Sequence, residues 1–179
     1  MNKLLFTAAL PLALVAVPAA AQDATGTVTI DGSVAGRCLF TLPNETISLG
    51  EMSLGGSDGN AGRLDTSVVN GRSATLVGWC NSAAAGMTVE AFPLLNTANA
   101  ATGFTNRVDF TATASANGTD GTDTTLTNGS GSTVSVGMFT GNIDVTLSNS
   151  SAPGNALLVA GDYDGSVEVT LTPIFVPAI

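Results

Sequence analysis

Apolar and polar residues alternate along most of this chain with a period of two, which is the pattern of half-buried β-strands. The first clear case is GTVTIDGSVA at 26–35. One face of an extended strand over these residues carries the row Val28, Ile30, Gly32 and Val34, and the opposite face is polar. This pattern predicts a strand over 27–35, near the start of the chain, where chains usually fray.

Nine further segments show strand-like patterns rich in valine and threonine, and Gly, Asn, Asp or Ser residues separate them. No helical period of useful length is present. The segments are 38–42, 46–49, 73–79, 86–92, 108–114, 133–139, 143–147, 156–160 and 166–172. Short strands at this spacing predict an all-β fold, arranged as an antiparallel sandwich.

Three polar stretches interrupt the strand pattern. Residues 115–132, SANGTDGTDTTLTNGSGS, contain almost no apolar side chain and predict a surface loop or a loosely ordered hairpin tip. Shorter polar loops are expected at 55–62 and 148–154. Because strand-like segments flank 115–132 on both sides, we interpret it as a loop within one domain and not as a linker between two.

The first 21 residues have the pattern of a secretory signal peptide. Lys3 precedes an apolar run over 4–17, and Ala19, Ala20 and Ala21 supply the small residues of a cleavage site, so we expect cleavage before Gln22. No later window is apolar for long enough to cross a bilayer, and we expect no membrane insertion. The mature chain is then long enough for one domain with its own core.

The chain contains two cysteines, Cys38 and Cys80. An even pair in an exported chain predicts a disulfide bond, whereas a redox or metal site would need closer spacing or further ligands. The loop closed by this bond would span about 43 residues, which corresponds to a stabilisation of about 4 kcal/mol in the chain-entropy model.

Charge and composition exclude several functions. Fourteen acidic residues face five basic ones, and loss of Lys3 leaves four arginines and a net charge of about −10. Nucleic acids and anionic membranes need clustered cations, so neither is an expected partner. The chain has no histidine, which removes Ser-His-Asp and Cys-His catalysis and histidine metal ligands.

The remaining candidate chemistry is weak. The aspartate pairs in GTDGTD (Asp120, Asp123) and GDYDGS (Asp162, Asp164) lack the ligand spacing of a calcium loop, and we interpret them as turn residues. A carboxylate pair for glycoside hydrolysis is conceivable, but the acids are scattered. We therefore expect a protein that is not an enzyme and that has no cofactor and no metal.

The order and spacing of several motifs resemble those of subunits of chaperone–usher pili, of the type 1-like or the spore-coat-U-like (archaic) branch. The motifs are GTVTIDGSVA followed by Cys38, TISLGEM at 46–52, Cys80 at a spacing of 42, and AGDYDGSVEVTLTP at 160–173. The resemblance covers most of the mature chain. It implies an incomplete immunoglobulin-like β-sandwich, the pilin fold, with an N-terminal donor strand. The implied domains are a signal peptide at 1–21, a donor-strand extension at 22–35 and a sandwich at 36–179.

The resemblance also implies a function, which is polymerisation into a bacterial surface fimbrium that supports adhesion or biofilm formation. The implied donor residues are Val28, Ile30, Gly32 and Val34, which enter a neighbouring subunit by β-augmentation. The implied acceptor groove is lined by Val167, Val169 and Leu171. The implied partners are identical or related pilin subunits, a periplasmic chaperone that lends a strand, and an outer-membrane usher. The subunit would be exported through the periplasm to the cell surface.

Two other interpretations stay open. The chain could be a self-complete envelope or coat sandwich in which 27–35 pair within their own chain, or a carbohydrate-binding adhesin module that uses Trp79 or Tyr163. A lone tryptophan beside a disulfide is more often a core residue. The segment TPIFVPAI at 172–179 departs from many pilins, because Pro173 and Pro177 interrupt strand hydrogen bonding. Its role and the branch of the family stay undetermined.

Overall fold

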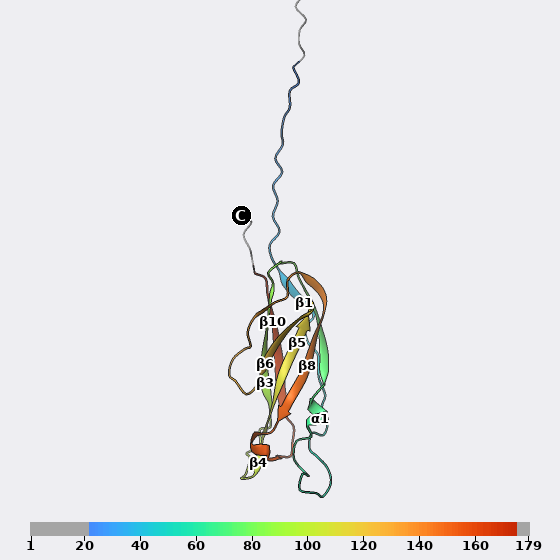
Figure 1. Cartoon of the computed structure of the whole chain (residues 1–179), viewed down its shortest axis with the longest axis vertical. Helices are drawn as coiled ribbons and strands as arrows, with labels where there is room; N and C mark the ends of the chain where they lie inside the picture. The colour runs from blue at the N-terminus through green and yellow to red at the C-terminus, as the bar shows by residue number, and fades with distance from the viewer. Residues whose placement is uncertain (1–21, 175–179) are drawn as a thin grey trace, which may run out of the picture. The chain divides into compact units, whose positions relative to one another are not determined.

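The computed structural model describes residues 22–174, and in that range the regular secondary structure is almost entirely β-strand (Figure 1). The predicted signal peptide at 1–21 and the tail residues 175–179 lie outside the described residues. The chain divides into two units between Ser33 and Val34. The all-β prediction is confirmed.

The predicted strand at 27–35 is not formed. Residues 22–37 contain no strand, and the side chains of Val28 and Ile30 are 85% and 90% exposed. A β-strand is stabilised by main-chain hydrogen bonds to a neighbouring strand, so alternation by itself does not produce one.

The second unit is organised around one sheet with the strand order β1-β2-β8-β5-β3-β10, in which every neighbouring pair is antiparallel. Two short strands branch from this path, with β6 paired to β5 and β7 paired to β3. The bounds are β1 Cys38–Leu42, β2 Ser73–Cys80, β3 Gly86–Leu95, β5 Arg107–Ala116, β6 Thr119–Thr124, β7 Val134–Ser135, β8 Phe139–Ser151 and β10 Asp164–Thr172.

Smaller elements complete the second unit. Strands β4 (Phe104–Thr105) and β9 (Leu157–Leu158) form a two-stranded parallel sheet, which the expected antiparallel arrangement did not include. Helix α1 (Thr66–Val69) begins after Asp65, whose carboxylate accepts a hydrogen bond from the Ser67 main-chain nitrogen at 3.0 Å. A 3₁₀ turn, η1, covers Pro153–Asn155. No helix among residues 22–174 is long and apolar enough to span a bilayer.

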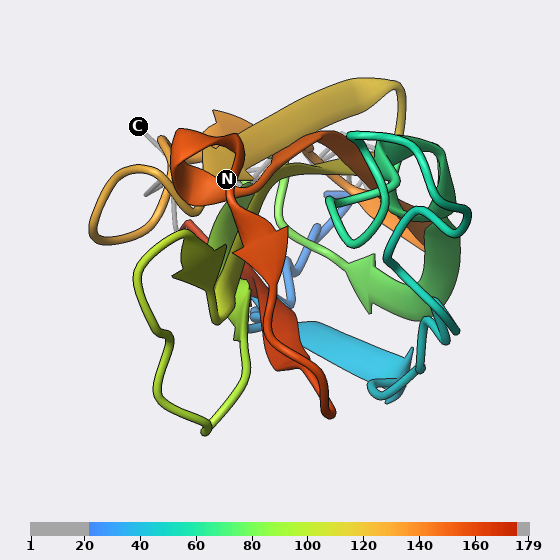
Figure 2. The same ribbon diagram turned by 90° about the horizontal axis from the view of Figure 1, so that it is seen from below.

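The sheet curves, as the view along the strands in Figure 2 shows, and its inward side chains form an apolar core. The alternating inward residues of the central strands are fully or almost fully buried. They are Met87, Val89 and Ala91 on β3, Val108, Phe110, Ala112, Ala114 and Ala116 on β5, and Ile143, Val145 and Leu147 on β8. Burial of these rows gives the sheet its stability, at about 25 cal/mol for each Å² of apolar surface removed from water.

Most predicted strands are present, with changed ends. The prediction 38–42 coincides with β1, and the predictions near β2, β3, β5 and β10 are right within a few residues. The predicted strand at 46–49 is wrong, since residues 43–49 form no strand. The prediction for 133–139 splits into β7 and the first residue of β8, and β9 keeps only two residues of 156–160.

The polar stretch 115–132 is not simply a loop. It holds the end of β5 and all of β6, which pairs with β5 from Thr111↔Thr124 to Ala116↔Thr119. Gly121 and Asp123 of β6 are buried although the stretch has almost no apolar side chain. The predicted loop at 148–154 is also partly wrong because β8 continues to Ser151, whereas 55–62 forms turns as expected.

Candidate functional site

The two edge strands of the main sheet, β1 and β10, each pair on one side only. Strand β10 pairs only with β3 and β1 pairs only with β2, so among the described residues each has one free main-chain edge. In Figure 2 the light blue β1 and the red β10 face each other across the opening of the sheet. A free strand edge is a template for pairing with another chain.

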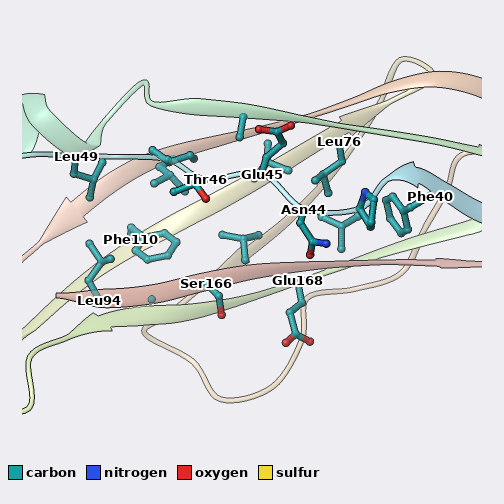
Figure 3. Close-up of a pocket in the computed structure, with 18 of the residues that line it drawn as sticks. Phe40, Asn44, Glu45, Thr46, Leu49, Leu76, Leu94, Phe110, Ser166 and Glu168 are labelled. Carbon is teal, nitrogen blue, oxygen red and sulfur yellow. The ribbon is translucent and has the colours of Figure 1, made fainter. Parts of the chain in front are cut away.

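A groove of about 630 Å³ lies along this opening (Figure 3). One wall is the segment from Phe40 through Leu49, and the other is β10 from Gly165 to Thr170. Its floor consists of apolar side chains from four strands, namely Ala74 and Leu76 of β2, Leu94 of β3, Phe110 of β5, and Val145 and Leu147 of β8. The core of the sandwich is therefore accessible along this edge.

A second hollow of about 640 Å³ adjoins the first and continues toward Tyr163. Its walls are residues 46–53 and 158–165. Both hollows are lined by Ile47, Leu49 and Leu94, so they form one long trough beside β10. We call the two hollows together the β10 groove.

Two of the three predicted acceptor residues line this groove. Val167 and Val169 are half-buried on the inward row of β10 and face Ala91 and Val89 across the β3 ladder. Figure 3 shows Ser166 and Glu168, which alternate with them, pointing away from Leu76 and Phe110. Leu171 is half-buried on the same row but lies beyond the groove lining, close to Gly78 of β2.

The predicted donor residues lie in a part of the chain without regular structure. Val28, Ile30 and Val34 are exposed, and nothing lies within 4 Å of the position that a Cβ atom on Gly32 would occupy. Because even numbers of residues separate these three aliphatic side chains, they would lie on one face of an extended strand. They form an apolar row that the described chain leaves uncovered.

The predicted disulfide between Cys38 and Cys80 is confirmed. The two cysteines face each other in the register of β1 and β2, so the bond holds the strand that leads into one wall of the groove. Asn81 supports the same region, since its Oδ1 accepts from the Arg37 main-chain nitrogen at 2.5 Å and its Nδ2 donates to the Ala35 carbonyl at 3.0 Å.

The two ends of the groove can be distinguished by their contacts. At one end β1 begins and β10 finishes. Asn81 bonds to Arg37, which directly precedes β1, and the hydroxyl of the neighbouring Ser82 bonds to the carbonyl of Ile174, which follows β10. We call this the Cys38 end. At the other end β10 begins, with Asp164 paired to Leu95. We call it the Tyr163 end.

Every charged residue that lines the groove is acidic. Glu45 and Glu168 lie along the first hollow, and Glu51, Asp162 and Asp164 lie along the second. The pKa of Glu51 is lowered, because the Ser53 hydroxyl and main-chain nitrogen donate to its carboxylate at 2.6 and 2.9 Å. The groove is thus apolar at its floor and negatively charged at its rim.

The other sequence candidates are dispersed. Trp79 is half-buried on the face of β2 opposite the buried Cys80, so the expectation that it is a core residue is wrong. Tyr163 is half-buried at the other end of the sandwich, and its hydroxyl lies 3.1 Å from the Thr105 carbonyl and 3.0 Å from that of Val159. The structure does not bring Trp79 and Tyr163 together.

Within residues 22–174 no three His, Cys, Asp or Glu side chains cluster as metal ligands.

No family model, no curated protein and no solved structure matches this chain. The groove itself contains residues that the sequence prediction did not include, above all the floor residues Leu76, Leu94 and Phe110 and the wall residues Ile47 and Leu49. Their apolar alternation was visible in the sequence. Which of them border an open edge depends on the strand order, which alternation does not specify.

Proposed function

We propose that this chain is a structural subunit of a bacterial surface pilus that polymerises by donor-strand complementation. In this proposal the second unit is an immunoglobulin-like sandwich that lacks one strand, and residues 22–35 supply that strand to another subunit. The observation that carries the proposal is the β10 groove, in which an apolar floor lies beside an unpaired strand edge. The motifs that resemble chaperone–usher pilins agree with it.

The donor segment and the groove fit each other in length and pattern. Residues 26–35 span about 33 Å when extended, and the nine residues of β10 span about 30 Å, at roughly 3.3 Å per residue. Both carry apolar side chains at every second position. A strand inserted beside β10 would therefore turn Val28, Ile30 and Val34 toward the core side of β10, with Gly32 at a position where no side chain needs space.

The exchange is favourable on physical grounds. Burial of three aliphatic side chains at roughly 1.5–3 kcal/mol each contributes about 5–9 kcal/mol before ordering costs. New main-chain hydrogen bonds would also cover the free edges of β10 and of the segment that follows β1. Each subunit offers a donor and an acceptor in different parts of its chain, and such a heterologous contact extends into a filament.

The proposal has consequences for export and partners. A free apolar groove aggregates, so a periplasmic chaperone would cover it until an outer-membrane usher exchanges the chaperone strand for the next subunit. The final location would be a fimbrium on the cell surface, where the filament supports adhesion or biofilm formation. The interpretation as a self-complete coat protein requires 27–35 to be a strand, and the exposed, irregular state of these residues favours the polymerising subunit.

The test is assembly of the purified mature chain. We expect ladders of polymers on gels of unboiled samples, and loss of the ladders when residues 22–34 are deleted. Electron microscopy of cells before and after deletion of this chain would show whether surface fibres depend on it. A mature chain that stays monomeric at all concentrations, or whose assembly does not need residues 22–34, would refute the proposal.

A further inference from the structure

We infer that an ion pair between Arg37 of one subunit and Asp164 of the next sets the register in which the donor strand lies in the β10 groove. This inference rests on the proposed function and names the contact that ends the donor strand. It identifies a second copy of this chain as the partner of the acidic rim at the Tyr163 end.

Arg37 is available for such a contact. Its main chain is held on both sides by Asn81, but its side chain is exposed and makes no hydrogen bond or ion pair with any part of the chain that the structure describes. The other three arginines of the described chain are engaged. Arg63 donates to the Gly59 and Asn155 carbonyls, Arg72 to the Val68 carbonyl, and Arg107 to Asp109 and the Thr125 carbonyl.

The acidic partner lies where the donor strand would leave the groove. Asp162 and Asp164 are exposed, line the groove at the Tyr163 end, and their carboxylates have no hydrogen-bond or ion-pair partner among residues 22–174. A donor strand antiparallel to β10 runs toward this end. A parallel donor would leave at the Cys38 end, where the acceptor's own residues Val34–Arg37 begin, and the two subunits would compete for the same space.

Three antiparallel registers turn the donor row toward the inward face of β10, since a slip by one residue would turn that row outward. The first places Ile30 opposite Val169, which sets Asp31 directly opposite Glu168 on the outer face. Like charges at directly opposed positions destabilise a sheet. A second register places Ile30 opposite Val167, and then Arg37 lies opposite Ala160 and gains no charged partner.

The remaining register avoids the like-charge pair of Asp31 and Glu168 and also gives Arg37 a charged partner. Ile30 lies opposite Leu171, Gly32 opposite Val169 and Val34 opposite Val167, so these three donor positions match the three predicted acceptor residues, while Val28 lies opposite Pro173, just beyond the end of β10. Asp31 then faces Thr170, which is polar and uncharged. Arg37 lies opposite Asp164, and its long side chain can follow the irregular ladder between Asp164 and Ser166.

The test uses the full mature chain with an intact disulfide and measures the rate of polymer formation at low salt. Arg37→Asp and Asp164→Arg each create a like-charge pair, and we expect each to slow assembly about fivefold. The double variant R37D/D164R restores opposite charges without changing the net charge, and its rate should return to within about twofold of the original. At 1 M salt the differences should shrink because surface charges are screened.

The controls separate this inference from the proposed function. Asp144→Arg changes the net charge as Asp164→Arg does, but it lies on the exposed face of β8 and should leave the rate unchanged. If the original chain forms no polymers, the proposed function itself fails. If it polymerises and both single variants match it, only the ion pair is refuted. If R37D/D162R is rescued and R37D/D164R is not, the register that pairs Ile30 with Leu171 is wrong.

Discussion

The main-chain nitrogen of Ala91 donates a hydrogen bond to the buried carboxylate of Asp123 at 2.8 Å. Ala91 pairs with Val167 of β10 on one edge of β3, but β3 pairs with β5 only at Leu94 and Leu95, so on the other edge a side chain from β6 takes the place of a strand partner at Ala91. Buried main-chain donors need such a partner. The contact explains why a polar residue is buried in a stretch that looks like a surface loop.

Asp123→Ala should lower the free energy of unfolding by about 1–3 kcal/mol, because it leaves the Ala91 nitrogen buried without an acceptor. Asp123→Asn keeps an oxygen that can accept the bond and should cost clearly less. Urea unfolding of both variants measures the difference. Equal stability of the two variants would contradict the role of the carboxylate as the acceptor.

Loss of the disulfide should cost much more. Cys38 and Cys80 are 42 residues apart, and replacing both by alanine should lower the free energy of unfolding by about 4 kcal/mol in the chain-entropy model. Urea unfolding of the double variant and of the oxidised original chain gives this value. The reduced original chain is the matched control, and its stability should resemble that of the double variant.

Tyr163 should make the stability sensitive to alkaline pH. Burial raises the pKa of its phenol above the usual value of about 10, and the neutral hydroxyl donates to carbonyl oxygens that a phenolate would repel. The folded-state pKa is the higher one, so this stabilisation is complete below the unfolded pKa of about 10 and is lost as the pH rises through the folded value.

The measurement is urea unfolding at neutral pH and above pH 10 for the original chain and Tyr163→Phe. The variant should be about 1 kcal/mol less stable at neutral pH, because it lacks the hydrogen bond, and less sensitive to alkali. Tyr163 is the only tyrosine in the chain, so the ultraviolet absorbance of the phenolate reports this group alone. A phenol that titrates below pH 10 would contradict the prediction.

The two faces of the donor segment should respond differently to the same new charge. Ile30→Asp places a carboxylate on the row that enters the apolar groove and should abolish polymer ladders, since burial of an unpaired charge is very costly. Thr29→Asp adds the same charge to the outward face and should leave ladders present. The isolated subunits should have equal stability, because both residues are exposed before assembly. Equal ladders from both variants would argue against strand insertion.

The comparison of sequence and structure separates two kinds of strand. Alternation predicted strands at segments such as 38–42 and 166–172. These segments do form strands, because each has a neighbour in the sheet, β2 and β3 respectively. Segments 27–35 and 46–49 show the same alternation and form no strand. The segment 119–124 shows none and forms β6, because its main chain pairs with β5 and its aspartate bonds to β3.

The candidate site was predictable only in part. The apolar row of β10 was visible in the sequence, and two of its three residues line the groove. The floor comes from four strands that are distant in the sequence, and no local pattern indicates that Leu76, Phe110 and Leu94 border the same opening. The acidic rim was not predicted either, since its members Glu45, Glu168 and Asp164 are scattered along the chain.

The sequence by itself determined the β class, the disulfide pair, the negative charge and the apolar row at 26–35, because each depends on residue type and short-range spacing. Only the tertiary structure decided that β10 has an unpaired edge and that the core is open beside it. Strand order arises from hydrogen bonds and packing between residues far apart in the chain. A period of two shows which face of a strand is apolar, but it does not show whether another strand lies next to it.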